Sequence, residues 1–326
     1  MQTILVTGGA GFIGANFIEY FLNTTKDIHI VNLDALTYAG TLSNLTDVKH
    51  YSNYTFERGD ICDRRLIEKL FEKYRFKGVI HFAAESHVDN SINNPDGFVN
   101  TNINGTFNLI DVAKNFWMKG PNDYKQDFKN ARFHQISTDE VYGDLQDGVF
   151  DEASPLKPSN PYSATKAAAD MLVQSYARTY GIEYIIARPS NNYGSYQYPE
   201  KLIPLAIKQL SRGRKIKLHN QGKPIRTWTH SEDTASALIT LYEKAERNKV
   251  YNISSQYEQS NYETVKKIIN SYFYCGWLFR IVKNDPIFII LKRFVELRGA
   301  SGSFALFFHR TLVAFYVNLQ AVFFSD

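Results

Sequence analysis

Cysteine is almost absent from the 326-residue sequence: only Cys62 and Cys275 occur, and they do not form a C-x-x-C pair. This excludes a disulfide framework and a cysteine-rich metal site, and it is typical of a reducing compartment. A secretory leader is not expected either, because the strand-like run at residues 4–7 follows Met1 without a basic segment or a small-residue cleavage site. We therefore expect a cytoplasmic protein.

An excess of charge of either sign is missing as well. The 37 Lys and Arg residues against 33 Asp and Glu residues give a net charge of +4, which does not indicate nucleic-acid binding but is compatible with an anionic small molecule. Hydrophobic residues make up 44% of the chain. This proportion favours a large buried core and argues against disorder or a coiled coil.

The first 190 residues alternate short β-branched runs with amphipathic stretches, a pattern typical of a parallel sheet with crossover helices. Strands are predicted at residues 3–7, 28–33, 54–58, 78–82, 132–137 and 184–188. Helices are predicted at residues 12–22, 64–74, 99–116 and 162–180. The sequence therefore predicts a doubly wound, Rossmann-type α/β fold.

After Pro189 the alternation gives way to shorter elements. They are predicted as a helix from Lys201, a strand at 216–218, a helix at 231–245 and a strand at 250–253. We divide the chain into a main domain at residues 1–190, a smaller C-terminal lobe at residues 191–269 and an atypical tail at residues 271–326. The tail holds 10 of the 23 Phe and only three acidic residues.

Directly after the first strand lies a glycine-rich run, GGAGFIG at residues 8–14, with G-x-x-G-x-x-G spacing. Glycines permit a tight turn, and the N-terminus of the following helix attracts a pyrophosphate. An ordinary strand-to-helix turn would give a similar run. Asp34, however, ends the second strand 20 residues after Gly14, where a carboxylate binds a ribose diol and repels a 2′-phosphate. The sequence therefore indicates a dinucleotide site that favours NAD over NADP.

Tyr162 and Lys166 are four residues apart in a predicted helix, so their side chains project from one face. A nearby ammonium favours the phenolate and lowers the pKa of a tyrosine toward the range of a general base. In a chain with 21 Tyr the spacing alone is expected by chance. It gains weight from its place after the fifth strand, which ends at Ser137-Thr138, in a chain with a dinucleotide loop.

Together these residues resemble the extended short-chain dehydrogenases/reductases that act on nucleotide sugars. Longer motifs narrow the resemblance to the dTDP-glucose 4,6-dehydratases over residues 1 to about 269. These motifs are LTYAG at 36–40, AAESHVD at 83–89, STDEVYGD at 137–144, SNNYG at 190–194 and PEKLIP at 199–204. The resemblance implies NAD as cofactor, dTDP-glucose as substrate, and a homodimer paired through the helices at 99–116 and 162–180.

The reaction implied by the resemblance is that of a lyase: the sugar is oxidised at C4, water is eliminated across C5 and C6, and the hydride returns to C6. Such chemistry needs a tyrosine base together with a separate acid and base. The resemblance assigns Tyr162 to the C4 hydroxyl, with Thr138 as its hydrogen-bonding partner and Lys166 as the neighbouring cation. It assigns Asp139 as the acid at C6 and Glu140 as the base at C5. Taken alone, an Asp-Glu pair is more often a pair of solvated loop residues.

The same motifs imply the residues around both ligands. The cofactor would be bound by Gly8, Gly11, Phe12, Ile13, Gly14, Asp34, Thr37, Asp60, Ile61, Ala83, Ala84, Tyr162, Lys166 and Asn192. The substrate would be bound by Ser86, Thr101, Thr138, Asn191, Lys201, Leu202, Arg226 and Asn261. Arg226 is either an ordinary surface arginine or the ligand of the diphosphate, which a guanidinium binds bidentately. His81, His87 and His134 are interpreted as structural, and no metal site is expected.

The resemblance has two gaps. Lys217-Leu218-His219 stands where the family has Pro-x-Tyr at the nucleobase, so the base preference stays open. The family's Arg-Pro-Gly-His-Asp segment is missing, and nothing in the tail at 271–326 matches. A changed reading frame, which we favour, a diverged lobe, or a membrane or partner contact would each explain the tail. Its apolar run at 311–324 is too short for a membrane span.

Two other functions stay open. A 4-epimerase or reductase of nucleotide sugars would share the cofactor loop and the Tyr162–Lys166 pair, but epimerases usually carry small residues in place of the two acids. A catalytically impaired NAD-binding protein would result if the missing segment prevents substrate capture. Loss of water from dTDP-glucose would separate a dehydratase from both.

Overall fold

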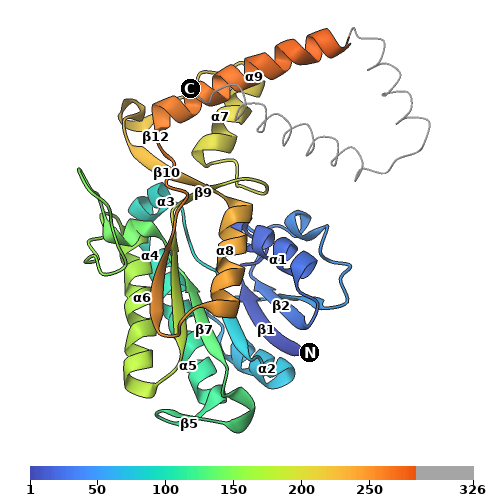
Figure 1. The fold of residues 1–326 in the computed structure, drawn as a ribbon, viewed down its shortest axis with the longest axis vertical. Coiled ribbons are helices and arrows are strands. Elements are labelled where there is room, and N and C mark those ends of the chain that lie inside the picture. The colour runs from blue at the N-terminus through green and yellow to red at the C-terminus, as the bar shows by residue number, and fades with distance from the viewer. Residues whose placement is uncertain (284–326) are drawn as a thin grey trace, which may run out of the picture. The chain divides into compact units, whose positions relative to one another are not determined.

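The computed structural model describes residues 1–283 (Figure 1). Most of the predicted tail at 271–326 therefore lies outside the described residues. The chain divides into two compact units, Met1–Val265 and a second that begins at Lys266. Helix α9 (Asn261–Lys283) begins in the first unit, and all features discussed below belong to that unit.

The first unit is built on a seven-stranded parallel sheet with the order β11-β8-β7-β4-β1-β2-β3. Its strands are β1 (Gln2–Thr7), β2 (Ile28–Asp34), β3 (Tyr54–Arg58), β4 (Gly78–His81), β7 (Arg132–Ile136), β8 (Tyr184–Pro189) and β11 (Lys249–Ile253). The six strands predicted before residue 190 are confirmed to within one residue at each end. Because β1 lies between β2 and β4, the strand order reverses beside it, and doubly wound sheets bind their ligands at such a point.

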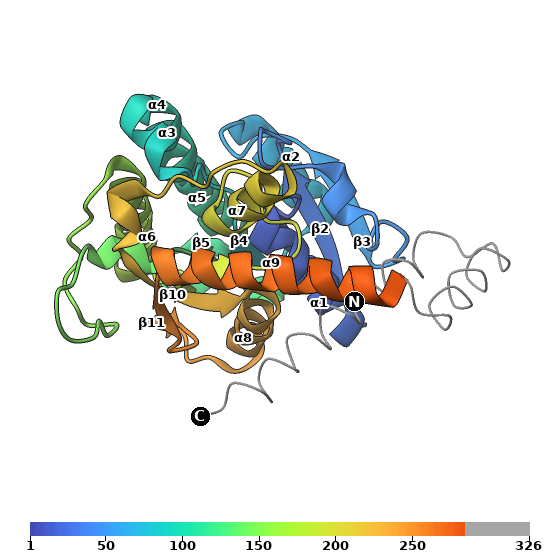
Figure 2. The same cartoon turned by 90° about the horizontal axis from the view of Figure 1, so that it is seen from above.

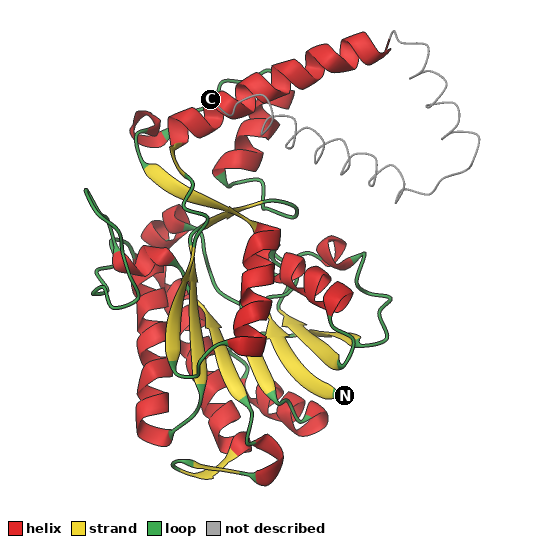
Figure 3. Cartoon of the chain, viewed as in Figure 1, coloured by secondary structure: helices red, strands yellow, loops and turns green. Residues whose placement is uncertain are grey.

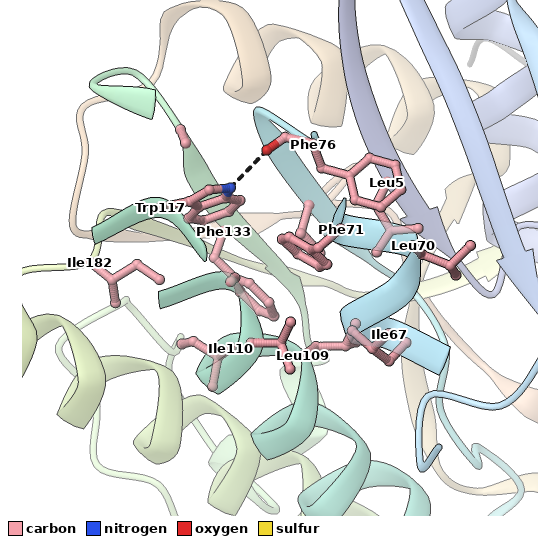
Figure 4. Close-up of a cluster of buried hydrophobic side chains, with 14 of the residues drawn as sticks. Leu5, Ile67, Leu70, Phe71, Phe76, Leu109, Ile110, Trp117, Phe133 and Ile182 are labelled. Carbon is pink, nitrogen blue, oxygen red and sulfur yellow. Dashed lines mark hydrogen bonds between the residues drawn. The ribbon is translucent and has the colours of Figure 1, made fainter. Parts of the chain in front are cut away.

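Alternate residues of the buried strands belong to opposite faces of the sheet. In β1, Ile4 and Val6 pack into one core, under the helices α1 (Phe12–Thr24) and α8 (Ser231–Lys244). Leu5 packs into the other core, under α2 (Arg64–Tyr74) and α5 (Thr106–Trp117). Both faces are covered, which explains why these strands are continuous apolar runs in the sequence. Figure 4 shows the second core, in which Trp117 Nε1 donates a 2.7 Å hydrogen bond to the Phe76 carbonyl.

Two helical layers cover the sheet (Figures 1 and 2). One contains α1 (Phe12–Thr24) and α8 (Ser231–Lys244), and the other contains α2 (Arg64–Tyr74), α5 (Thr106–Trp117) and α6 (Pro161–Tyr180). The ends of α6 are set by local sequence. Asn160 and Ser163 form a capping box around Pro161, and Gly181 takes the left-handed conformation after the last turn.

The remaining elements are short (Figure 3). A three-stranded sheet has the order β12-β10-β9 and consists of β9 (Asn191–Tyr193), β10 (Ile225–His230) and β12 (Glu258–Ser260). The short helices are α3 (Val88–Asn93), α4 (Pro95–Phe98) and α7 (Leu202–Ser211). The 3-10 helices are η1 (Leu42–Leu45), η3 (Gln126–Phe128), η4 (Asp139–Tyr142) and η5 (His219–Gly222), and β5 (Met118–Gly120) pairs with β6 (Asp123–Tyr124).

The predicted helix at 99–116 is not a single α-helix. It begins as a π-helix, η2 (Val99–Gly105), and continues as α5. The Asn102 side chain bonds to the backbone N–H and carbonyl of Glu85 and to the Thr165 hydroxyl. These tertiary contacts stabilise the wider π-helical turn, and no pattern along the sequence predicts them.

The smaller C-terminal elements also differ from expectation. Residues 216–218 form no strand, because no neighbouring strand pairs with them; the strand of this region is β10, which pairs with β9 and β12. The helix and strand predicted at 231–245 and 250–253 are present as α8 and β11, but they complete the large sheet and its helical layer. Within residues 1–283, no helix combines the length and apolar character needed to cross a membrane.

Candidate active site

A cavity of about 420 Å³ opens where the strands of the large sheet end. It is lined by residues that directly follow six of these strands: Gly8, Ala35, Gly59, Phe82, Ser137 and Ser190. Every residue predicted to bind the cofactor or the substrate lines this cavity, and so does the predicted base Glu140. Asp139 is the exception among the predicted site residues, because it does not form part of the cavity wall.

The glycine loop brings backbone atoms closer together than side chains would allow. Gly8 has a φ of +73°, and a Cβ built on it would lie 2.5 Å from the Ala83 backbone nitrogen. A Cβ on Gly14 would overlap the Gly8 carbonyl oxygen. The helix α1 that follows has no side-chain hydrogen bond at its N-cap, Gly11, so its first N–H groups are available to an anionic ligand.

The Asp34 carboxylate binds the backbone on both sides of the cofactor end of the cavity. Its Oδ2 accepts a hydrogen bond from the Ala10 N–H over 2.9 Å, and its Oδ1 accepts one from the Leu36 N–H over 2.8 Å. Burial raises the pKa of Asp34, and these two bonds oppose that effect. The residue predicted to bind the ribose therefore also fixes the position of the glycine loop.

Tyr162 and Lys166 both line the cavity from α6. Lys166 Nζ donates a 2.7 Å hydrogen bond to the Ile136 carbonyl, and burial lowers its pKa to about 8 while Asp170 acts in the opposite direction. Burial and the Glu140 carboxylate raise the pKa of Tyr162, and a hydrogen bond with Thr138 only partly offsets this. The pKa of Tyr162 is therefore raised overall, where the sequence predicted a fall toward the range of a general base, and the contribution of Lys166 stays a prediction.

The predicted acid and base begin the short helix η4. The Thr138 hydroxyl accepts a hydrogen bond from the Glu140 N–H and donates one to Asp139 Oδ1, both over 3.3 Å. Burial and the charge of Glu140 raise the pKa of Asp139 to about 6. This carboxyl group can therefore hold a proton close to neutral pH, as a general acid must.

Two cationic groups, Lys201 and Arg226, also line the cavity. Lys201 Nζ donates to the Ser86 carbonyl over 3.2 Å, and burial lowers the pKa of Lys201. The Arg226 guanidinium on β10 forms no ion pair with any carboxylate of the described residues, and its charge lowers the pKa of Asp139. A cation without an acidic partner at the cavity suits an anionic ligand.

Histidine contacts agree in part with the structural interpretation. His81 is buried with Nδ1 2.7 Å from the Thr7 hydroxyl and Nε2 3.0 Å from the Thr106 hydroxyl, and burial lowers its pKa to about 3. His87 caps α3, but its Nε2 also lies 3.8 Å from the Glu200 carboxylate. The sequence pattern gave no sign of this contact across more than 100 residues.

Comparison with known proteins identifies the family. The model of the GDP-mannose 4,6 dehydratase family matches residues 5–274. A dTDP-glucose 4,6-dehydratase of Neisseria meningitidis is 47% identical over 270 residues, which make up 82% of this chain and 75% of that protein. The chain belongs to the dTDP-glucose 4,6-dehydratase family. The family match ends at residue 274, close to the predicted end of the resemblance at about 269.

Solved structures of dTDP-glucose 4,6-dehydratases have the same fold. The enzyme from Bacillus anthracis, in complex with NAD, has a TM-score of 0.74 at 40% identity and covers 83% of this chain and 81% of its own. The enzyme from Streptomyces venezuelae, with NAD and TYD bound, has a TM-score of 0.76 at 37% identity with the same coverage. The predicted fold class is therefore confirmed.

Two acids on the cavity wall of this dehydratase were missing from the predicted site. Glu85 and Glu200 both line the cavity, and burial together with the Glu200 charge raises the pKa of Glu85. Each lies inside a motif that was used for the family resemblance, at 83–89 and 199–204. Their place inside these motifs could have identified them, but only neighbouring residues of the two motifs, such as Ser86 and Lys201, were predicted to belong to the site.

Proposed function

We propose that this dehydratase converts dTDP-glucose into dTDP-4-keto-6-deoxyglucose with NAD as cofactor. The observation that carries the proposal is the acid pair of η4 beside Tyr162, in which Asp139 has a pKa of about 6. Oxidation and re-reduction at C4 alone would need the tyrosine but no separate acid and base. Elimination of water needs both, and this arrangement supplies them.

The cavity fits a dinucleotide at its glycine end. Gly8 and Gly14 allow the backbone of the glycine loop to pack tightly, and the uncapped N-terminus of α1 at Gly11 offers its N–H groups to a pyrophosphate. Asn192 lines the cavity with a buried Oδ1 that has no hydrogen-bond partner among the described residues. This oxygen can accept a hydrogen bond from the carboxamide of a nicotinamide ring. Bound NAD would supply the two-electron oxidation at C4 and the matching reduction at C6, and its cationic ring would favour the Tyr162 phenolate.

The first proton leaves the sugar at the C4 hydroxyl. We assign it to Tyr162, which hydrogen-bonds with Thr138 and lines the cavity one helical turn before Lys166. The Lys166 ammonium is held in place by the Ile136 carbonyl. Its positive charge close to the tyrosine stabilises the negative charge that develops on the phenol oxygen.

Elimination then uses the two acids of η4. A ketone at C4 acidifies the C5 proton. Glu140, on the cavity wall, takes this proton, exchanges it with solvent, and delivers a proton to C5 when C6 is reduced. Asp139 donates its proton to the C6 hydroxyl, which leaves as water. The proton that Tyr162 took from the C4 hydroxyl passes to solvent, and solvent reprotonates Asp139, so the cycle is balanced.

The test incubates the purified chain with NAD and dTDP-glucose and follows the product by mass spectrometry. The proposal predicts a product lighter by one water, with the total nicotinamide in its oxidised form at the end of each turnover. A 4-epimer of unchanged mass would instead support an epimerase. Tight NAD binding without any product would support an impaired NAD-binding protein.

We also keep the predicted homodimer as part of the proposal. Four large apolar side chains are exposed on the helices around residues 88–180: Ile92 on α3, Val99 on η2, Phe107 on α5 and Met171 on α6. Apolar residues gathered on adjoining helices are typical of a protein interface. A second copy of the chain would cover them by pairing the predicted helices.

The domain and compartment assignments stay proposals. Residues 1–190 supply every glycine and acid of the cofactor end, and residues 191–269 supply Asn191, Lys201, Arg226 and Asn261 at the substrate end. We propose the cytoplasm as the compartment, because both NAD and a nucleoside diphosphate sugar are charged molecules that do not cross a bilayer unaided.

A further inference from the structure

A buried polar chain joins two segments of the candidate active site. Arg188 on β8 donates from Nε to Asp170 Oδ2 over 3.0 Å and from Nη1 to the Tyr142 hydroxyl over 2.8 Å. The Tyr142 hydroxyl donates in turn to Asn252 Oδ1 on β11 over 2.8 Å. The side chains of Asp170 and Arg188 are 0% and 3% exposed. None of these four residues lines the cavity.

Asp170 belongs to the same face of α6 as the proposed catalytic pair. Tyr162, Lys166 and Asp170 follow one another at intervals of four residues, which places them about one helical turn apart. The Asp170 carboxylate favours the charged form of Lys166 against the effect of burial. The ion pair with Arg188 therefore holds Asp170 in place, on the helix face that carries Tyr162 and Lys166 into the cavity wall.

Tyr142 belongs to the segment that carries the acid and the base. It is the last residue of η4, two positions after Glu140. Its ring stacks on Phe150 with centroids 5.0 Å apart and lies 4.9 Å from the Arg188 guanidinium carbon. Ring packing alone would keep Tyr142 buried, whereas the hydroxyl fixes the direction of the side chain toward β8 and β11.

Stability of the fold does not explain why these charges are buried. The free-energy cost of removing two charges from water often exceeds the energy of their attraction. Apolar residues of similar size can therefore fill a core equally well. A guanidinium differs from an apolar group in offering N–H donors in fixed, divergent directions. Arg188 uses one of them for α6 and another for η4, so it links the two segments at a defined separation.

We propose that Arg188 is a positioning residue for the dehydration. Through Tyr142 it holds the acid–base pair of η4, and through Asp170 it holds the catalytic face of α6. This inference rests on the proposed function, because only dehydration needs both segments to act on one sugar. Oxidation at C4 uses the α6 pair, whereas elimination also needs the acids of η4. Loosening the Tyr142 branch therefore slows elimination and leaves oxidation nearly unchanged.

The first test compares Tyr142→Phe with Tyr242→Phe in the full chain loaded with NAD. Each change removes one buried hydroxyl. Within residues 1–283 the Tyr242 hydroxyl accepts one hydrogen bond, from the Gln2 side chain, and Tyr242 does not line the cavity. Single turnovers with dTDP-glucose in deuterated water report oxidation through the nicotinamide absorbance. They report elimination through the loss of water and through the incorporation of solvent deuterium at C5. We expect elimination to fall about 10- to 100-fold in Tyr142→Phe, as for a misplaced catalytic group, with oxidation within about twofold.

This result has a visible signature, since reduced nicotinamide accumulates when elimination lags behind oxidation. Tyr242→Phe is expected to match the wild type in both steps. Equal losses in oxidation and elimination for Tyr142→Phe would indicate general disruption and overturn the inference. Unchanged elimination would overturn it as well.

The second test uses Arg188→Lys, which keeps a positive charge opposite Asp170 but offers one nitrogen instead of a fork. We expect the same selective loss of elimination. The double variant Tyr142→Phe/Arg188→Lys is expected to eliminate water no more slowly than the slower single variant, because both changes break the same Arg188–Tyr142 hydrogen bond. Additive losses would overturn the inference. A wild-type chain that releases no water overturns the proposed function and this inference together, whereas an active wild type with an unaffected Tyr142→Phe overturns the inference alone.

Discussion

Asp34 Oδ2 accepts a hydrogen bond from the Ala10 N–H over 2.9 Å, so the end of β2 is tied to the glycine loop after β1. The other carboxylate oxygen accepts from the Leu36 N–H. One side chain thus connects two loops that are more than 20 residues apart in the sequence. Asp34 prepares the backbone for the cofactor in addition to offering oxygens to a ribose.

Asp34→Asn is predicted to weaken NAD binding about 10- to 100-fold, because an amide replaces one charged acceptor with a donor that faces a backbone N–H. Calorimetric titration with NAD measures this change. Asp27→Asn, at an exposed position before β2, is the matched control and is expected to bind NAD like the wild type. Equal affinity in the two variants would contradict the role given to Asp34.

Gly14→Ala is predicted to abolish measurable NAD binding or to lower stability by about 1–3 kcal/mol, because its methyl group would overlap the Gly8 carbonyl. Thermal unfolding and NAD titration separate these two effects. Gly97→Ala in α4 is the control, since nothing lies within 4 Å of the added Cβ and its φ is not positive. That variant is expected to be neutral or slightly more stable. An intact Gly14→Ala protein with normal affinity would show that the loop is less tight than described.

Asp139 links pH to stability as well as to chemistry. Its pKa rises from 3.8 to about 6 on folding, so the folded chain keeps a proton that the unfolded chain loses between these values. The free energy of unfolding therefore falls as pH rises through this window, by up to about 3 kcal/mol. Asp139→Asn is predicted to raise the melting temperature near pH 8 but to leave it unchanged near pH 4.

The same variant is predicted to slow elimination by about 100-fold or more, because an amide cannot donate the proton that a leaving hydroxyl needs. Asp144→Asn, at an exposed position in the same motif, serves as the control for both measurements. A melting temperature of Asp139→Asn that follows the wild type at every pH would show that the carboxyl group is not destabilised by burial.

Met171→Glu is predicted to yield a monomer in multi-angle light scattering. Met171 is 58% exposed on α6, and a carboxylate there would be buried without a partner if two copies pair through this helix. Val149→Glu, at a loop residue that is 91% exposed, is the matched control and is expected to keep the wild-type mass. A monomeric wild type would rule out the proposed pairing at the concentration used.

Local patterns were sufficient to predict the large sheet up to residue 190 and most of its helices. A buried parallel strand such as 28–34 is an apolar run whose character does not depend on the partner beside it. The ends of α6 follow from Asn160 and Gly181, which act within a few residues of themselves. The same holds for the glycine loop, where residue type alone permits the close backbone approach.

What the sequence by itself determined is therefore the fold class, the cofactor loop and the residues gathered at the cavity. Only the tertiary structure decided three other features: the π-helix at Val99–Gly105, the strand pairing of β10, and the direction of the Tyr162 pKa. Each depends on groups distant in the chain, whose distances become short only after folding. Charge effects and hydrogen bonds act over a few ångströms in space, so spacing along the sequence could suggest the Tyr162–Lys166 pair but not the burial that raises the tyrosine pKa.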